Sequence, residues 1–299
     1  MFHKTILAVS LLIVGAGVAG AETPQQRGKY LVNTIMACGN CHTPKDASGK
    51  PIKAKDLSGG GVTFTIPPYN GAAPNITPDR ETGIGNWSDE AIKRALTHGE
   101  RPANARLPGV PLAIMAANFF KAILPEDQTA IVAYLRSVKP VRNAVAAPVY
   151  RAPVRHDHYP EADAGYTKAM MKDPVKRGSY LATIGHCMEC HSPREKGVSD
   201  YGKTGLGKGG RKFMPADVQG FPASWQGATA ANITSHPEKG LGKWTDAEIK
   251  RALTHAVARD GRPFTPPMDR KQFFSRMTES DLDAIVGRLV SAARGGSVA

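Results

Sequence analysis

Apolar residues recur at helical spacing in several stretches of this chain, and they rarely alternate with polar residues as a half-buried strand requires. The clearest helices are 88–97 and 245–254, which open on the good N-cap residues Ser88 and Thr245 and carry acidic side chains in their first turns. Further helices are predicted at 25–37, 125–138, 175–184 and 279–292. The pattern therefore predicts an all-α fold.

The predicted helices occur twice in the same order, because the chain repeats itself once. An Arg-Gly-x-Tyr-Leu segment around Gly28 returns around Gly178. The block 75–98, with its Asn-Ile-Thr, Gly-x-Gly and Trp positions, returns at 232–255. The glycine early in the first helix of each copy predicts a close helix crossing.

Between the copies lies a stretch, 140–172, without apolar periodicity. It carries four prolines, Pro140, Pro148, Pro153 and Pro160. Such a composition indicates an extended linker. We therefore expect one domain at 22–139 and a second at 173–299.

The first residues have the features of an export signal. His3 and Lys4 give a positive start, 6–18 is apolar, and the small residues at 19–21 suit cleavage. We expect 1–21 to be a signal peptide and the protein to work in the periplasm. The apolar run is short for a membrane span, and an uncleaved signal that acts as an anchor stays open.

The chain is strongly basic, with a formal net charge of +13 at pH 7. An exported protein rarely meets nucleic acid, so we expect no nucleic-acid partner. An acidic protein surface or anionic lipid is the better counterpart, and the latter would allow peripheral membrane association. Solubility alone would also account for the charge.

All four cysteines lie in two copies of one pattern, Cys-x-x-Cys-His. The copies are Cys38, Cys41 and His42, then Cys187, Cys190 and His191. Two thiols one helical turn apart can add across the two vinyl groups of haem, and the next histidine presents its imidazole to the iron. The pattern therefore predicts two covalently bound haem c groups.

Two other interpretations of the cysteines fit less well. Disulfides within adjacent Cys-x-x-Cys pairs are normally redox-catalytic, and neither pair follows a strand–helix–strand pattern. A four-cysteine zinc site would join pairs far apart in the chain and leave the trailing histidines unexplained.

Each half resembles a class I cytochrome c domain, and the tandem is similar to the multihaem cytochrome subunits of bacterial periplasmic alcohol, aldehyde and sugar-acid dehydrogenases. The similarity rests on the haem motifs, on the Asn-Ile-Thr segments followed by Gly-x-Gly and Trp87 or Trp244, and on the closing helix around 130–137. It covers nearly the whole chain after the predicted signal. Members of that family commonly have three haem domains, whereas this chain has two.

The resemblance implies an electron-transfer protein that is not itself an enzyme. It would relay electrons from a periplasmic or membrane-bound dehydrogenase toward the respiratory chain, through a downstream redox protein or a terminal oxidase.

In class I domains the sixth iron ligand is usually a methionine between the middle and closing helices, and the resemblance implies Met115 and Met268. Met268 is preferred to Met214 and Met277 because, like Met115, it precedes a Phe-Phe pair and the closing helix. These methionines would complete the iron sites that begin with the two motif histidines. The alternative is that they only fill core space.

His98 and His255 occupy equivalent positions in the two copies, so an iron held by two histidines stays open. Both stand at the end of a predicted helix, where a histidine commonly interacts with the last carbonyls.

An iron held by histidine and methionine has no open position for substrate, which favours a carrier. The rival is a dihaem enzyme, such as a peroxidase or a thiosulfate dehydrogenase, in which one iron lacks methionine. The two halves are closely similar and each supplies a methionine, which favours the carrier again.

Basic residues gather after each haem motif. They are Lys45, Lys50, Lys53 and Lys55 in the first half, and Arg194, Lys196, Lys203, Lys208, Arg211 and Lys212 in the second. Around an exposed haem edge they would steer an acidic redox partner. A solvated loop face is the alternative.

Overall fold

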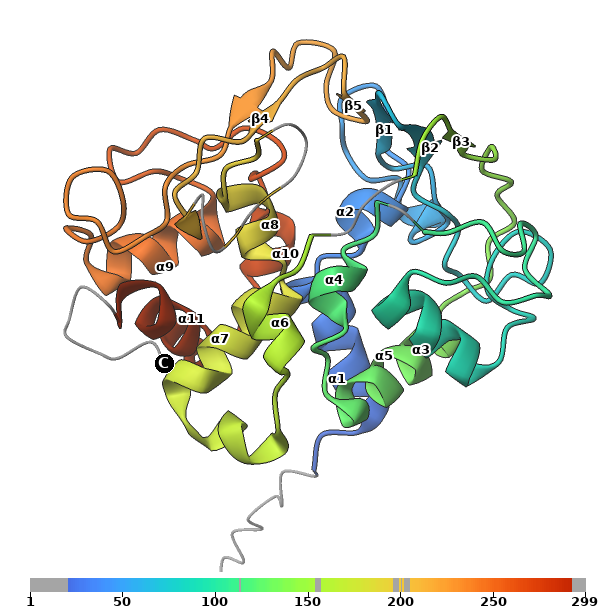
Figure 1. Ribbon diagram of the computed structural model, residues 1–299, viewed down its shortest axis with the longest axis horizontal. Helices are drawn as coiled ribbons and strands as arrows, with labels where there is room; N and C mark the ends of the chain where they lie inside the picture. The colour runs from blue at the N-terminus through green and yellow to red at the C-terminus, as the bar shows by residue number, and fades with distance from the viewer. Residues whose placement is uncertain are drawn as a thin grey trace, which may run out of the picture.

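The computed structural model describes residues 21–112, 114–153, 157–195, 199, 201 and 205–291. The predicted signal peptide lies outside these residues except for its last position. Helices dominate and the strands are short. Figure 1 shows two halves side by side, the first in blue to green and the second in yellow to red. This architecture confirms the all-α, two-domain prediction, while the domain boundaries stay predictions.

The elements of the first half come in the order α1 (Pro24–Tyr30), η1 (Leu31–Ile35), α2 (Gly39–His42), η2 (Lys53–Lys55), β1 (Thr63–Ile66), β2 (Tyr69–Ala72), α3 (Asp89–His98), α4 (Ala117–Phe120) and α5 (Pro125–Ser137). They are followed by β3 (Val149–Tyr150), α6 (Pro160–Ala164), η3 (Lys168–Lys172), α7 (Pro174–Ile184), α8 (Cys187–His191), β4 (Lys212–Phe213), β5 (Val218–Gln219), β6 (Ala228–Thr229), α9 (Asp246–His255), α10 (Lys271–Phe274) and α11 (Glu279–Val290).

The two clearest predicted helices are present as α3 and α9, and both predicted N-caps are confirmed. The Ser88 hydroxyl accepts a hydrogen bond from the Ala91 amide at the start of α3. The Thr245 hydroxyl accepts one from the Glu248 amide, and the Glu248 carboxylate accepts one from the Thr245 amide in return. Local sequence therefore sets where these helices begin.

In each half the first and the closing helix cross closely at a glycine. A Cβ added at Gly28 in α1 would lie 1.9 Å from the carbonyl oxygen of Ala130 in α5. A Cβ added at Gly178 in α7 would lie 1.9 Å from that of Ala284 in α11. No side chain fits at either distance, so the predicted role of the two glycines is confirmed.

Two reciprocal hydrogen bonds, each from a tyrosine of one half to an aspartate of the other, join the halves. The Tyr30 hydroxyl of α1 donates to Asp281 Oδ2 of α11 over 2.6 Å, and the Tyr180 hydroxyl of α7 donates to Asp127 Oδ2 of α5 over 2.6 Å. Within its own half, each aspartate also pairs with an arginine of the first helix. Both carboxylates are buried, so losing a partner would leave a charge unsatisfied inside the protein.

The start of the predicted linker packs against the first half. The Asn75 side-chain amide donates to the Val141 carbonyl over 2.8 Å, the Asn143 amide donates to Thr82 Oγ1 over 3.0 Å, and the Asn143 side chain donates to the Ser58 carbonyl over 3.0 Å. This part of the linker is therefore fixed to the first domain.

One small sheet joins the linker and both halves. Its strand order is β3-β2-β1-β5, with every neighbouring pair antiparallel. β1 and β2 belong to the first half, β3 to the linker and β5 to the second half. A second sheet pairs β4 with β6. The joined sheet brings the segment after β4 over the first haem motif.

Candidate haem-attachment sites

The first motif runs into α2, and its histidine is oriented by a backbone carbonyl. His42 Nδ1 lies 2.7 Å from the Pro74 carbonyl oxygen. A carbonyl only accepts, so Nδ1 carries the proton and Nε2 keeps its lone pair for a metal. The next residue, Asn75, accepts a hydrogen bond from the Thr77 amide over 2.9 Å, which fixes the turn that holds this carbonyl.

The second motif, in α8, repeats this arrangement. His191 Nδ1 lies 2.7 Å from the Ala231 carbonyl oxygen, and Asn232 accepts from the Thr234 amide over 2.9 Å. The repeated Asn-Ile-Thr segment therefore has a physical role in both halves. Burial lowers the pKa of both ring systems, which keeps the imidazoles neutral and able to ligate iron.

The four cysteines are free thiols. Burial raises the pKa of Cys38 to about 12 and that of Cys187 to about 11. Burial raises the pKa of Cys41 as well, whereas at Cys190 a hydrogen bond with His186 and the charge of Arg211 outweigh burial and lower the pKa. A redox-catalytic pair needs an accessible thiolate. The raised pKa keeps three of the four thiols protonated, which does not suit such a pair.

Among the residues that the structure describes, no three His, Cys, Asp or Glu side chains gather closely enough to hold a metal ion by themselves. A four-cysteine zinc site therefore has no ligand set there.

A cavity in the first half brings the sequence-predicted residues together. Cys38, His42 and Met115 all line it, and Trp87 lines it too. The other lining side chains are mostly apolar, and they include Val32, Ile76, Ile84, Leu96, Leu107 and Leu135. An apolar cavity with a thiol, an imidazole and a thioether in its wall fits a covalently attached haem with two axial ligands.

Met115 and Met268 have the same local backbone. The Met115 amide donates to the Leu112 carbonyl over 3.2 Å, and the Met268 amide donates to the Thr265 carbonyl over 3.1 Å. Each methionine carbonyl then accepts from the amide two residues later, over 2.7 Å in both cases. Met268 packs against the same apolar cluster as Leu253 of α9, the counterpart of the cavity-lining Leu96. The two methionines are therefore structural equivalents.

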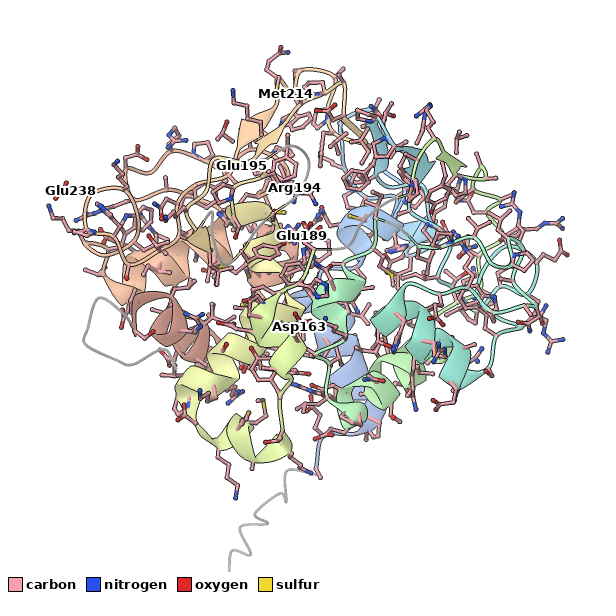
Figure 2. The ribbon with its side chains drawn as sticks, in the orientation of Figure 1. Asp163, Glu189, Arg194, Glu195, Met214 and Glu238 are labelled. Carbon is pink, nitrogen blue, oxygen red and sulfur yellow. The ribbon has the colours of Figure 1, made fainter. Side chains whose placement is uncertain are left out.

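Three of the four alternative ligands are exposed. His98 and His255 are exposed at the ends of α3 and α9, where each ring bonds the hydroxyl of the preceding threonine over 2.7 Å and 2.8 Å. Met214 is 44% exposed and lies at the outer edge of the molecule, as Figure 2 shows. Met277 packs in the same apolar cluster as Met268.

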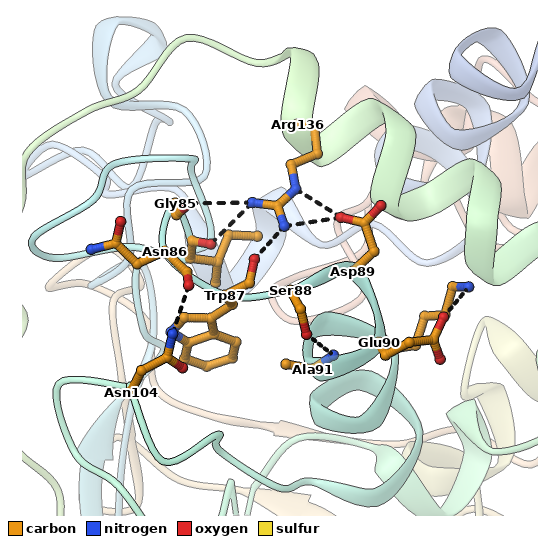
Figure 3. Close-up of polar contacts among 11 residues, drawn as sticks. Gly85, Asn86, Trp87, Ser88, Asp89, Glu90, Ala91, Asn104 and Arg136 are labelled. Carbon is orange, nitrogen blue, oxygen red and sulfur yellow. Dashed lines mark hydrogen bonds and ion pairs between the residues drawn. The ribbon is translucent and has the colours of Figure 1, made fainter.

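Arg136 of α5 holds the loop between the Asn-Ile-Thr segment and α3, a role that the sequence did not suggest (Figure 3). Its guanidinium donates to Asp89 Oδ1 over 2.9 and 3.1 Å, to the Ile84 carbonyl over 3.3 Å and to those of Gly85 and Trp87. The arginine thereby fixes Ile84 and Trp87, two walls of the cavity.

The two motifs meet where the halves touch. Cys41 and Cys190 pack against one apolar cluster, formed by Val62 of the first half and Phe213, Val218 and Trp225 of the second. Packing across the boundary is reciprocal near the motifs: Phe120 of α4 stacks edge-on against His186, and Phe273 of α10 lies 3.5 Å from a Cβ placed at Gly39. Groups attached at the two motifs would share this boundary.

No protein-family profile matches the chain. The cytochrome c subunit of the quinone-dependent alcohol dehydrogenase of Gluconobacter oxydans is 31% identical over 265 residues, which cover 82% of this chain and 50% of that protein. The fructose dehydrogenase cytochrome subunit of Gluconobacter japonicus is 28% identical over 96% of this chain and 58% of its own length. A dihaem cytochrome c of Cereibacter sphaeroides is 30% identical over 59% of this chain and 60% of its own length.

The chain spans between 50% and 60% of the length of these relatives. The match nevertheless covers most of its own residues, and it agrees with the paired Cys-x-x-Cys-His motifs and their oriented histidines. Over most of its length, this chain is therefore a homologue of the cytochrome c subunits of bacterial alcohol and fructose dehydrogenases.

Proposed function

We propose that this protein is a dihaem electron carrier that serves a dehydrogenase. Its cofactors are two covalently bound haem c groups, as the cytochrome relatives imply. One is attached at Cys38 and Cys41 with His42 as an iron ligand. The other is attached at Cys187, Cys190 and His191. The observation that carries the proposal is the repeated hydrogen bond from each motif histidine to a backbone carbonyl, which leaves Nε2 for the metal.

In this proposal Met115 and Met268 would each supply the second protein ligand to a haem iron. Haem iron held by histidine and methionine exchanges single electrons between Fe(II) and Fe(III) and offers no open position to a substrate. The protein's own residues keep water away from the group, since Val32, Ile84 and Leu135 wall the first cavity. The equivalent backbone at the two methionines supports the same assignment in both halves.

The relay runs within one chain. Cys41 and Cys190 pack against the same apolar cluster, so groups attached there would start from neighbouring points. The reciprocal Tyr30–Asp281 and Tyr180–Asp127 bonds hold the halves in one orientation. A fixed, short separation favours electron exchange between the two groups without a further carrier.

The partners in this proposal are a dehydrogenase that supplies electrons and a downstream redox protein or oxidase that removes them. The relatives are named as subunits of alcohol and fructose dehydrogenases, which supports the first. The export features at 1–21 support a periplasmic location, with peripheral membrane association through the basic surface. Among the described residues, no helix is long and apolar enough to cross a bilayer.

Part of the predicted basic surface has a structural role instead. Lys45 lies over the Phe221 ring at 4.7 Å, and Arg211 donates to the Glu189 carbonyl over 2.7 Å. The exposed members that the structure describes are Lys50, Lys53, Lys55, Arg194, Lys208 and Lys212, and Arg194 lies 3.6 Å from Asp157 Oδ2. Lys196 and Lys203 lie outside the described residues. We propose that the exposed lysines steer the acidic partner, so the reduction rate by that partner falls as salt rises.

Optical spectra of protein made in a host that attaches haem c test the function. A carrier shows low-spin spectra, a near-infrared methionine-to-iron band in the oxidised state that accounts for both haems, and no consumption of peroxide. A high-spin haem that consumes peroxide would replace the carrier by a dihaem enzyme.

A further inference from the structure

A buried arginine lies at the boundary where the two haem motifs meet. Arg270 is 9% exposed and directly precedes α10. It stands two residues after Met268, and its carbonyl accepts the amides of Phe273 and Phe274 over 2.9 and 3.0 Å. The first motif begins next to Ala37, which packs in one apolar cluster with these two phenylalanines. Arg270 therefore belongs to the second half but borders the first motif.

The charge of Arg270 has no carboxylate partner in the part of the chain that the structure describes. Its Nε donates to the Pro267 carbonyl over 3.1 Å, and its guanidinium lies 5.9 Å from the centre of the Phe274 ring. No ion pair between described residues includes it. The half-buried carboxylate in this region, Glu189, already lies 3.2 Å from His186 Nδ1 and is flanked by Arg194 and Arg211. Arg270 is thus a buried cation that pairs with no carboxylate among the described residues.

Contacts of the same segment reach both sites. Phe273 donates its amide to the Arg270 carbonyl, and its ring lies 3.5 Å from a Cβ placed at Gly39 in the first motif. Met268, the proposed iron ligand of the second half, stands two residues before Arg270. The guanidinium therefore belongs to a buried segment that touches the first motif and is part of the second site.

We propose that Arg270 is a shared cation that raises the reduction potential of both haems. This inference rests on the proposed function. Each reduction adds one electron close to the guanidinium, and a fixed cation in a poorly solvated region stabilises the added negative charge. Arginine keeps its charge at all working pH values, so the effect is permanent. The haem pair is thereby set to accept electrons, as a carrier beside a dehydrogenase must.

The first half contains a half-buried arginine of its own. Arg101 lines the first cavity, is half-buried, and belongs to no ion pair between described residues. Its Nη1 donates to the carbonyls of Val110 and Pro111 over 2.7 and 3.1 Å. It lies in one half, whereas Arg270 lies between the two. A third arginine, Arg262, is exposed and faces Asp260 over 3.8 Å on the surface. The three arginines therefore differ in where their charge lies: between the halves, within the first half, and on the surface.

Spectroelectrochemical titration of the full chain with both haems attached tests the proposal. We expect Arg270→Gln to lower both midpoint potentials, each by roughly tenfold in the reduction equilibrium constant, or about 59 mV for one electron. Arg270→Lys should restore most of both shifts. Arg101→Gln should lower only one midpoint, which assigns that wave to the first haem, and Arg262→Gln should leave both in place.

Two results would overturn the shared role. One is Arg270→Gln moving a single wave or none while the methionine-to-iron band stays intact, and the other is Arg101→Gln moving both waves equally. Protein that carries no haem absorbance at all would instead refute the proposed function, so the two failures are distinguishable. A methionine-to-iron band that stays intact shows that a variant is folded, so a shifted potential then reports the lost charge. If Arg270→Gln does not fold, the potentials of Arg270→Lys are compared with those of the parent instead.

Discussion

The two halves share the contacts that orient the motif histidines and differ in the parts that surround them. Both orient a histidine on a carbonyl over 2.7 Å, and both cross their helices at a glycine. The first site is further walled by residues of the linker, Val145, Ala146 and Pro148, and tied by Arg136. The hydrogen bond of His42 is partly buried, whereas that of His191 is exposed. The duplication thus kept the ligand geometry and changed the solvent access, which is one of the factors that set a haem potential.

The largest expected effect tests the shared helix crossing. Gly28→Val and Gly178→Val should each lower the free energy of unfolding by about 3 kcal/mol or prevent folding, because the new side chain would overlap a carbonyl of the closing helix. Urea unfolding followed by far-ultraviolet circular dichroism measures this.

The matched control is Gly287→Ala in α11, where a Cβ has no atom within 4 Å. That variant should be as stable as the parent or more so, since alanine favours a helix over glycine by about 1 kcal/mol. If Gly28→Val and Gly178→Val were as stable as Gly287→Ala, the close contact between the first and closing helices would be contradicted.

The next largest loss of stability should come from removing the hydrogen bonds that join the halves. Tyr180→Phe and Tyr30→Phe should each cost about 1–3 kcal/mol, because a buried carboxylate loses a donor. The Tyr180 bond is buried and the Tyr30 bond only partly so, and we expect the first variant to cost more. Chemical unfolding of both variants checks the order. A loss below about 0.5 kcal/mol in both would show that these bonds do not hold the halves together.

A pH effect should arise at Glu161, which contacts the second half. Glu161 accepts from Ser179 and pairs with Arg288 of α11, and although burial opposes the shift, these partners lower its pKa below the ordinary 4.5. A carboxyl with a depressed folded pKa contributes stability above its unfolded pKa, and that stability is lost as the pH falls through the folded pKa. Glu161→Gln should therefore cost about 1–2 kcal/mol at pH 7 and flatten the acid loss below pH about 4.5. Thermal unfolding between pH 7 and pH 3 measures it, and an unchanged acid slope would contradict the assignment.

The smallest effect should come from Arg136, which has no counterpart on α11. Arg136→Ala removes donors to three loop carbonyls, and we expect a loss of about 1 kcal/mol. The optical spectrum of the first haem should change while that of the second stays constant. A change at both haems would mean that this arginine acts through the whole molecule and not through its loop.

Local chemistry made much of this molecule predictable from sequence. The N-caps Ser88 and Thr245 and the spacing of the cysteines act within a few residues of themselves, so their patterns are visible in the chain. The crossing glycines contact a distant helix, and the repeat of the segment around Gly28 and Gly178 made them visible. The axial methionines needed the comparison of the two copies, and the structure adds their equivalent backbone. That they bind iron stays a prediction.

Long-range contacts explain what the sequence did not suggest. The Tyr30–Asp281 bond joins residues 251 positions apart, and no local periodicity marks it. The linker contains prolines but packs on the first half, because Val141 and Asn143 satisfy polar groups of the Asn-Ile-Thr loop. The position of Arg270 between the motifs likewise depends on how α10 meets the first half.

Intact mass spectrometry of denatured protein, made in a host that attaches haem c, tests the central claim most directly. The account predicts the mass of the polypeptide plus two haem groups, and the loss of one group in the Cys38→Ser/Cys41→Ser variant and of the other in Cys187→Ser/Cys190→Ser. A mass equal to that of the amino acids alone would contradict it.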